Sequence, residues 1–122
     1  MDVAHNEPAA QVLADALRAR AASGRTLAVA GILGDKDAAA ITRLLDDQVD
    51  QWVLAGIGDE PRGLSAEQLA QRIAPLRAPP LLKADVRQAC ECARALARPG
   101  DRVVVLGSFH VVGPALHWLG LY

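Results

Sequence analysis

Apolar positions follow two patterns that alternate along the chain, one typical of helices and one typical of buried strands. Between Glu7 and Ala22 the apolar residues recur at helical spacing, which predicts a helix with one buried face. Thr26–Ile32 is instead a short continuous apolar run, as expected for a strand covered on both faces. The same patterns predict further helices over 37–46, 65–73, 85–97 and 111–119, and further strands at Gln51–Ala55, Leu81–Lys83 and Val103–Leu106.

This alternation predicts a mostly parallel sheet, because parallel strands are joined by crossover connections that are usually helices. We therefore expect an α/β fold, a Rossmann-like three-layer sandwich, built from residues 1–122 as a single domain. The continuous apolar runs place Val29 and Val104 on central strands of that sheet.

Helix start and stop signals occur at the predicted boundaries. Ser65 followed by Gln68 is the pattern of a capping box, and Leu64 is placed to pack on Leu69 as a hydrophobic staple. The pair Pro99-Gly100 ends the predicted helix 85–97. These local signals agree with the apolar pattern at both ends of the predicted helices.

Composition argues against several classes of protein. The net charge is -1 and no Lys/Arg cluster stands out, so the chain shows no electrostatic footprint for nucleic acid or for a membrane surface. The first residues lack the basic and apolar regions of a signal peptide, and no apolar stretch approaches the ~20 residues of a membrane span. We expect a cytoplasmic protein. Cys90 and Cys92 point to nearly opposite sides of a helix, which excludes a disulfide or a shared metal between them there.

The most informative polar segment follows the first predicted strand. In open α/β sheets ligands bind beyond the carboxyl ends of the strands. There Gly31 and Gly34 allow close backbone approach, a helix N-terminus supplies N–H groups, and Lys36 adds a cation, which together suit an anion. The segment is not a Walker A loop. The alternative is that Asp37 caps the helix and Lys36 is a solvated side chain.

Other polar residues also belong to this predicted edge. Asp2 and His5 precede the first helix, where a carboxylate can bond a ribose hydroxyl, although Asp2 can equally cap the turn. Ser108 follows the last strand and can donate to a carboxylate or phosphate, or cap a terminal helix. The three histidines and two cysteines form no Ser-His-Asp set and no metal-ligand pattern, so we assign no catalytic residue and no metal site.

Four motifs, in order, resemble one family. They are Asp2–Asn6, Gly31–Asp37, the Pro61–Gly63 tripeptide with the following Ser65–Leu69, and Gly107–Gly113. They are similar to the C-terminal domain of the folylpolyglutamate synthases in the Mur ligase superfamily, and most of all to the bacterial bifunctional dihydrofolate synthase/folylpolyglutamate synthases. One position departs from the pattern, because His110 stands where the family usually has Tyr.

The resemblance implies a reaction and separate roles for this chain and for an N-terminal domain. The parent enzyme would join L-glutamate to dihydropteroate or a folate: ATP phosphorylates the acceptor carboxylate, and the glutamate amine attacks the acyl phosphate. ATP and Mg²⁺ would be held mainly by an N-terminal ATPase domain outside this chain. Asp2 and His5 match nucleotide-contacting positions, whereas Lys36 and Ser108 match positions that hold the amino-acid carboxylate in Mur ligases.

We therefore expect one domain of a longer, monomeric enzyme. Residues 1–4 resemble the last turn of a strand that begins upstream, and the chain by itself is expected to be inactive. Two alternatives stay open: a stand-alone Rossmann-like module that binds a nucleotide or phosphate, and the C-terminal domain of a peptidoglycan-precursor ligase.

Overall fold

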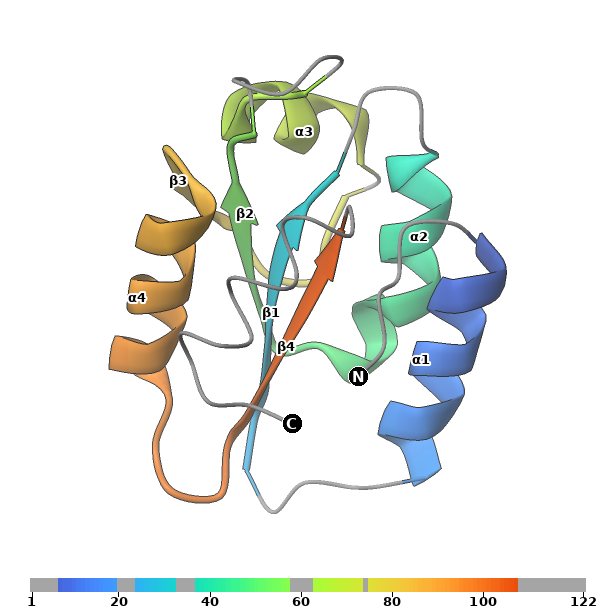
Figure 1. Cartoon of the computed structure of the whole chain (residues 1–122). Coiled ribbons are helices and arrows are strands. Elements are labelled where there is room, and N and C mark those ends of the chain that lie inside the picture. Colours follow the sequence, from blue (N-terminus) through green and yellow to red (C-terminus); the bar gives the residue numbers. More distant parts are fainter. Residues whose placement is uncertain (1–6, 20–23, 33–36, 58–62, 74, 108–122) are drawn as a thin grey trace.

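The computed structural model describes residues 7–19, 24–32, 37–57, 63–73 and 75–107. Helices and strands alternate through this part of the chain (Figure 1). The helices are α1 (Glu7–Ala19), α2 (Ala38–Leu45), α3 (Ala66–Arg72) and α4 (Val86–Leu96), with a short 3₁₀ turn, η1, at Asp46–Gln48. The strands are β1 (Thr26–Gly31), β2 (Gln51–Ala55), β3 (Leu81–Lys83) and β4 (Arg102–Gly107). The predicted bounds of β2 and β3 are confirmed.

The four strands form one parallel sheet in the order β3-β2-β1-β4. Val29 lies on β1, which has a neighbour on each side, so its predicted central position is confirmed. The prediction for Val104 is wrong within the described sheet, because β4 pairs with β1 alone. A continuous apolar run reports that both faces of a strand are packed, and it carries no information about pairing along both edges.

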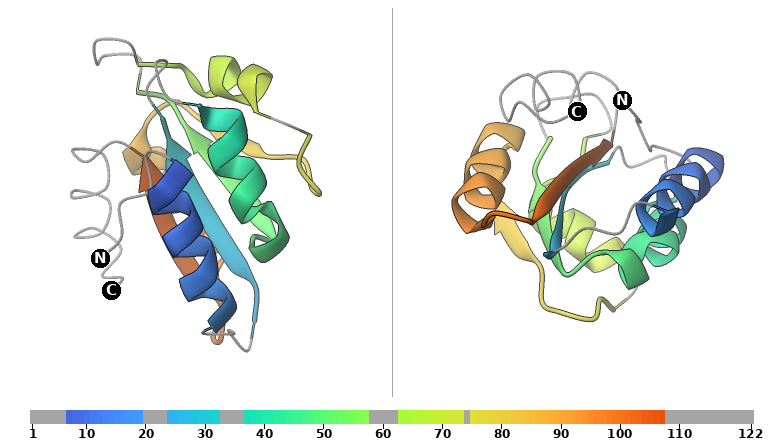
Figure 2. Two further views of the ribbon diagram at one scale, coloured as in Figure 1. Left: turned by 90° about the vertical axis from the view of Figure 1, so that its right-hand side faces the viewer. Right: turned by 90° about the horizontal axis from the view of Figure 1, so that it is seen from below.

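Three layers make up the domain, as predicted. Helices α1, α2 and α3 cover one face of the sheet and α4 covers the other (Figure 2). Alternate residues along β1 serve the two layers: Ala28 and Ala30 pack under α1 and α2, whereas Val29 packs under α4 beside Ala89 and Cys90. Every residue of β1 is buried, which explains its unbroken apolar sequence.

The described helices α2, α3 and α4 begin at side chains that bond their own first turn. Asp37 accepts the N–H of Ala40, and Asp85 accepts that of Gln88. The capping box predicted for α3 is confirmed, since the Ser65 hydroxyl accepts from Gln68 while the Gln68 side chain accepts the Ser65 N–H. The residues of the predicted staple, Leu64 and Leu69, are both buried in the same core cluster.

At the amino edge of the sheet, Asp101 joins the starts of β1 and β4, and its side chain is only 6% exposed. The Asp101 carboxylate accepts the backbone N–H of Arg25 at 2.7 Å and that of Arg98 at 3.0 Å. Gly24 donates its N–H to the carbonyl of Gly100, whose φ of 93° lies in the left-handed region that glycine tolerates. A Cβ at position 24 would collide with Asp101, so a glycine is required there.

Two predicted helices differ from the structure or lie beyond it. Leu96 belongs to the apolar stripe of the predicted helix 85–97 but is 37% exposed, because it is the last residue of α4. The predicted helix at Val111–Leu119 lies outside the described residues, as do residues 20–22 of the first predicted helix. None of the helices in the described part of the chain is long and apolar enough to cross a membrane.

Candidate functional site at the carboxyl edge of the sheet

The carboxyl ends of all four strands lie along one edge, which is where ligands bind in open α/β sheets. Ala55 at the end of β2 pairs with Lys83 at the end of β3, and Gly31 at the end of β1 pairs with Gly107 at the end of β4. Helices α1, α2 and α4 also begin at this edge, because they run opposite to the strands (Figure 1). The segments that follow the strands therefore start side by side, as the sequence predicted.

The pairing of Gly31 with Gly107 is the most informative feature of this edge. Neighbouring strands lie ~4.8 Å apart. Lys36 lies five residues after Gly31 in the sequence, and Ser108 directly follows Gly107. The two chain segments that carry the predicted carboxylate-binding residues therefore leave the sheet from adjacent positions.

The four residues assigned from the sequence lie outside the described part of the chain: they are Asp2, His5, Lys36 and Ser108, and Arg62 and His110 lie outside it as well. The described chain nevertheless bounds their segments. Glu7 starts α1 shortly after His5, and Ile32 and Asp37 stand on either side of residues 33–36. The roles of these residues stay predictions.

Asp37 caps the N-terminus of α2, as predicted by the alternative in which this residue serves the helix and not a ligand. Its Oδ1 accepts the N–H of Ala40 at 3.1 Å, and its carbonyl accepts the N–H of Ile41. An exposed carboxylate at this position offsets part of the positive end of the helix dipole. An anion bound near α2 therefore needs a cationic side chain, and the helix terminus alone is a weaker site than the sequence suggested.

The loop that follows β2 has a base built by backbone contacts. Gly56 donates to the carbonyl of Lys83 at 3.1 Å, and Ile57 donates to that of Leu64 at 2.8 Å. A Cβ at Gly56 would lie 2.5 Å from the carbonyl oxygen of Ala84, so only glycine lets β2 end this close to the turn after β3. This base fixes the described residues on either side of 58–62.

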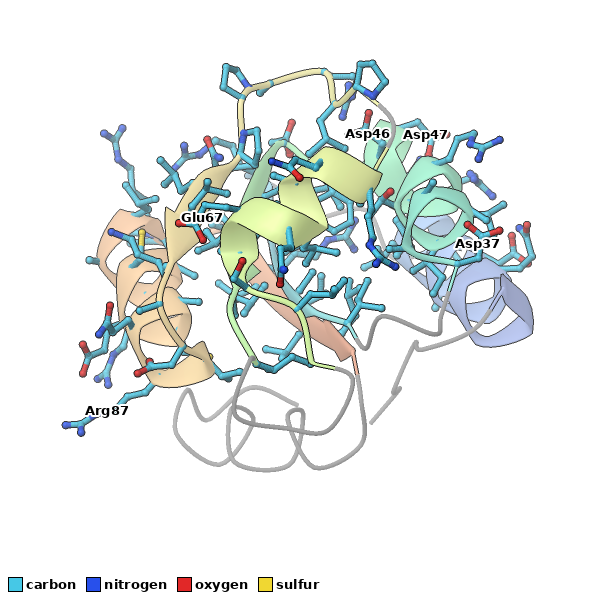
Figure 3. All side chains as sticks on the ribbon, turned by 90° about the horizontal axis from the view of Figure 1, so that it is seen from above. Asp37, Asp46, Asp47, Glu67 and Arg87 are labelled. Carbon is cyan, nitrogen blue, oxygen red and sulfur yellow. The ribbon has the colours of Figure 1, made fainter. Side chains whose placement is uncertain are left out.

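Sequence reasoning did not single out one described cation at this edge. Lys83 ends β3, is half-buried, and lies on the face covered by α4, because its register partner Ala55 packs there. The sequence could have indicated Lys83 as a cation at this edge, because it is the last residue of a predicted strand. The acidic side chains Asp37 and Glu67 stand in or just before the first turns of their helices and are exposed (Figure 3).

Neither a metal centre nor a reactive thiol is evident in the described chain. Its His, Cys, Asp and Glu side chains form no group of three or more that could hold a metal ion. Burial raises the pKa of the Cys90 thiol to about 11, which keeps the sulfur protonated and unreactive at neutral pH. Cys92 is half-buried, and both cysteines are free.

Comparison with known proteins places the chain in a family. The family model described as "Mur ligase, glutamate ligase domain" matches residues 1–109. The chain belongs to the Mur ligase family. The dihydrofolate synthase/folylpolyglutamate synthase of Escherichia coli K12 is 41% identical to this Mur ligase domain over 111 residues, which are 91% of the chain and 25% of that relative.

Solved structures agree with this assignment. E. coli FolC in complex with ADP matches the Mur ligase domain with a TM-score of 0.85 and 38% identity, covering 98% of this chain and 28% of FolC. A bifunctional folylpolyglutamate synthase/dihydrofolate synthase with Mn, AMPPNP and L-glutamate bound matches with a TM-score of 0.82 and 40% identity, over 99% of this chain and 28% of that one. The chain spans about a quarter of the length of the curated relatives it matches.

Proposed function

We propose that this chain is the C-terminal domain of an ATP-dependent carboxylate–amine ligase that adds L-glutamate to dihydropteroate or to a folate. The parent protein would phosphorylate the acceptor carboxylate with ATP, and the amine of glutamate would then displace phosphate from the acyl phosphate. The proposal is supported by relatives with both synthase activities in their names and by a related structure that holds L-glutamate together with a nucleotide analogue.

One observation on this molecule carries the proposal: the side-by-side ends of β1 and β4 at Gly31 and Gly107. Glutamate reacts through its amine, so both of its carboxylates stay negative and need fixed partners when they leave water. We propose that Lys36 supplies the cation and Ser108 a neutral donor, because their segments leave the sheet from these paired residues. The Asp37 carboxylate at the start of α2 makes the charge of Lys36 more important.

We propose that Asp2 and His5 contact the nucleotide. Both precede α1, whose N-terminal end lies at the same edge as the ends of the strands (Figure 1). A carboxylate in such a place can accept a hydrogen bond from a ribose hydroxyl. No residue of this chain is assigned to bond making or breaking, so the domain positions substrates and does not itself carry the chemistry.

The remainder of the parent would supply ATP and Mg²⁺ binding. The described residues offer no group of metal ligands, and we assign none to this chain. We propose that an N-terminal ATPase domain holds ATP, Mg²⁺ and most of the folate, that the parent is a cytoplasmic monomer, and that the isolated chain turns over neither ATP nor glutamate.

A chimeric enzyme tests the proposal directly. The part of the E. coli synthase that precedes the matched region would be joined to this chain, whose 41% identity with the replaced region favours correct docking. We expect the chimera to form dihydrofolate from dihydropteroate, glutamate and ATP, and to extend folate with glutamate, whereas the isolated chain forms neither.

Two further assays make the result decisive. The same chimera with Lys36→Ala should lose glutamate-dependent turnover at low glutamate and regain much of it at high glutamate. A chimera that is folded and binds ATP, but adds an amino acid only to a peptidoglycan precursor, would overturn the folate assignment. Turnover by the isolated chain that scales with its concentration would overturn the proposal that catalysis requires the N-terminal ATPase domain.

A further inference from the structure

A polar groove lies at the amino edge of the sheet, at the opposite end from the candidate active site. Its volume is about 240 Å³, and its polar lining consists of Arg18, Thr26, Asp47, Gln48, Asp50, Arg77 and Arg102. Pockets for drug-sized ligands measure ~300–1,000 Å³, so the groove suits a smaller molecule. It lies where α1 ends, beside η1 and the first residues of β1 and β4.

Arg77 is held in place at this groove by neutral oxygens. Its Nε donates to the carbonyl of Asp46 at 3.0 Å and its Nη2 to that of Val49 at 2.7 Å. Within the described residues, no carboxylate forms a salt bridge with its guanidinium. The Asp46 carboxylate accepts the backbone N–H of Arg77 at 3.2 Å, so the exposed guanidinium is oriented and has no salt-bridge partner of its own in the described chain, which favours binding of a carboxylate.

The two aspartates of the groove, Asp47 and Asp50, can also still accept hydrogen bonds from a ligand. Asp50 uses Oδ2 to accept the N–H of Thr26 at 2.7 Å, and its Oδ1 has no partner in the described chain. Asp47 meets Arg18 at 3.7 Å, and both side chains are at least half exposed. Such a surface ion pair contributes little and breaks readily. Two carboxylates are thus free to accept bonds from a cationic group.

The balance of charge selects the class of ligand. A simple anion such as phosphate would meet Asp47 and Asp50, and a simple cation would meet the three guanidiniums of the groove. A small zwitterion satisfies both signs at once. We propose that the groove binds a free α-amino acid, with its carboxylate on Arg77 and its ammonium between Asp47 and Asp50. This site is separate from the proposed glutamate site, which lies at the other end of the strands.

Titrations followed by NMR of the ¹⁵N-labelled chain test the proposal. Glycine is the probe, because it has no side-chain carboxylate for the proposed glutamate site. We expect millimolar binding, with amide shifts centred on Gln48, Asp50 and Arg77. Inorganic phosphate and methylammonium, each carrying one sign of charge, should bind at least about tenfold more weakly, because each lacks one charge-assisted contact.

Matched variants locate the site. Asp47→Asn, at an exposed position that leaves the fold intact, should weaken glycine binding roughly tenfold. Arg87→Ala is the control, because Arg87 projects from the outer side of α4 (Figure 3) and should leave the affinity unchanged. Phosphate binding tighter than glycine, equal loss in both variants, or no shifts near Gln48 and Arg77 would overturn the proposal.

Discussion

The two edges of the sheet are built from the same strands but use their polar residues differently. At the amino edge, side chains bond to distant parts of the chain: Asp101 joins Arg25 to Arg98, and Arg102 donates to the Thr26 hydroxyl at 2.6 Å. At the carboxyl edge, the described side chains Asp37 and Asp85 bond only the first turn of their own helices. The described side chains of the amino edge therefore hold distant segments together, whereas those of the carboxyl edge fix only the starts of their own helices.

This difference follows from the topology of a parallel sheet. All strands end at the carboxyl edge, and the connections that leave it are not constrained by the pairing below them. At the amino edge the chain must return from helices into β1 and β4, and the buried Thr26 and the nearly buried Asp101 side chain fix these returns. Substitutions at the two edges should then affect different quantities, one catalytic and one thermodynamic.

The largest effect should come from Lys36→Ala in the full-length or chimeric enzyme. We expect the KM for glutamate to rise roughly tenfold to hundredfold, because a charge-assisted hydrogen bond is lost. The KM for ATP and the stability should change little. Steady-state kinetics with glutamate varied at saturating ATP measures this. Lys36→Arg should restore the KM for glutamate only partly, since a planar guanidinium replaces the compact ammonium of lysine.

Lys83→Ala is the matched comparison for that experiment. Lys83 also lies at the carboxyl edge, but on the α4 face of an edge strand. We expect its loss to leave the KM for glutamate unchanged. If Lys83→Ala raises that KM and Lys36→Ala does not, the carboxylate site lies near β3 and the assignment of Lys36 is wrong.

Asp2→Ala should act on the nucleotide instead. We expect the KM for ATP to rise by up to roughly a hundredfold with a smaller change for glutamate, because the lost bond would join a carboxylate to the nucleotide. His5→Ala should act in the same direction but more weakly. Separate titrations of ATP and glutamate with each variant decide this. Equal effects on both substrates would indicate that Asp2 merely caps the turn before α1.

At the amino edge, Gly24→Ala should reduce stability without changing either KM. The new methyl group would collide with Asp101, whose carboxylate is already held by two backbone N–H groups. Overpacking of this kind costs about 1–3 kcal/mol. Urea denaturation followed by circular dichroism measures the loss. The exposed Gln71→Ala on α3 is the control and should stay within ~0.5 kcal/mol of the parent chain.

The smallest expected effect is on how stability falls at low pH. Hydrogen bonds from the backbone N–H groups of Arg98 and Arg25 lower the pKa of Asp101 in the folded chain. The unfolded chain then binds a proton more readily, with a pKa of ~3.9. The stabilisation from Asp101 is complete above that pH and is lost as the pH falls through the lower folded value. In urea denaturation from pH 7 to low pH, Asp101→Asn should flatten the acid-dependent loss of stability relative to the parent chain.

The local structure was predictable from the sequence because its causes are local. The predicted bounds of β2 and β3 and the capping box of Ser65 and Gln68 are confirmed, since each depends on residues a few positions apart. The apolar run of β1 also reported burial correctly, because every residue of β1 is buried between two layers of helices, whereas Val103 and Val104 on β4 are only half-buried. The motifs around Gly31 and Gly107 further identified the family without a structure.

The amino edge could not be predicted, because its partners lie far apart in sequence. Arg102 bonds Thr26 across 76 positions, and Arg77 bonds Val49 across 28. No periodicity in the sequence links such pairs, and Arg77 and Arg102 cannot be told from ordinary surface arginines by sequence alone. The groove that they line exists only because the strand starts, η1 and the end of α1 converge in the folded chain.

The sequence by itself determined the element order, the helix caps, the α/β class and the family, because periodicity and short motifs act within a few residues. The tertiary structure alone decided the strand order, which makes β4 an edge strand within the described sheet and puts Val104 off the centre. It also decided that Gly31 and Gly107 are partners, although they lie 76 positions apart in the sequence. An apolar pattern records which faces of a strand are packed, whereas lateral neighbours are chosen by how whole layers fit together.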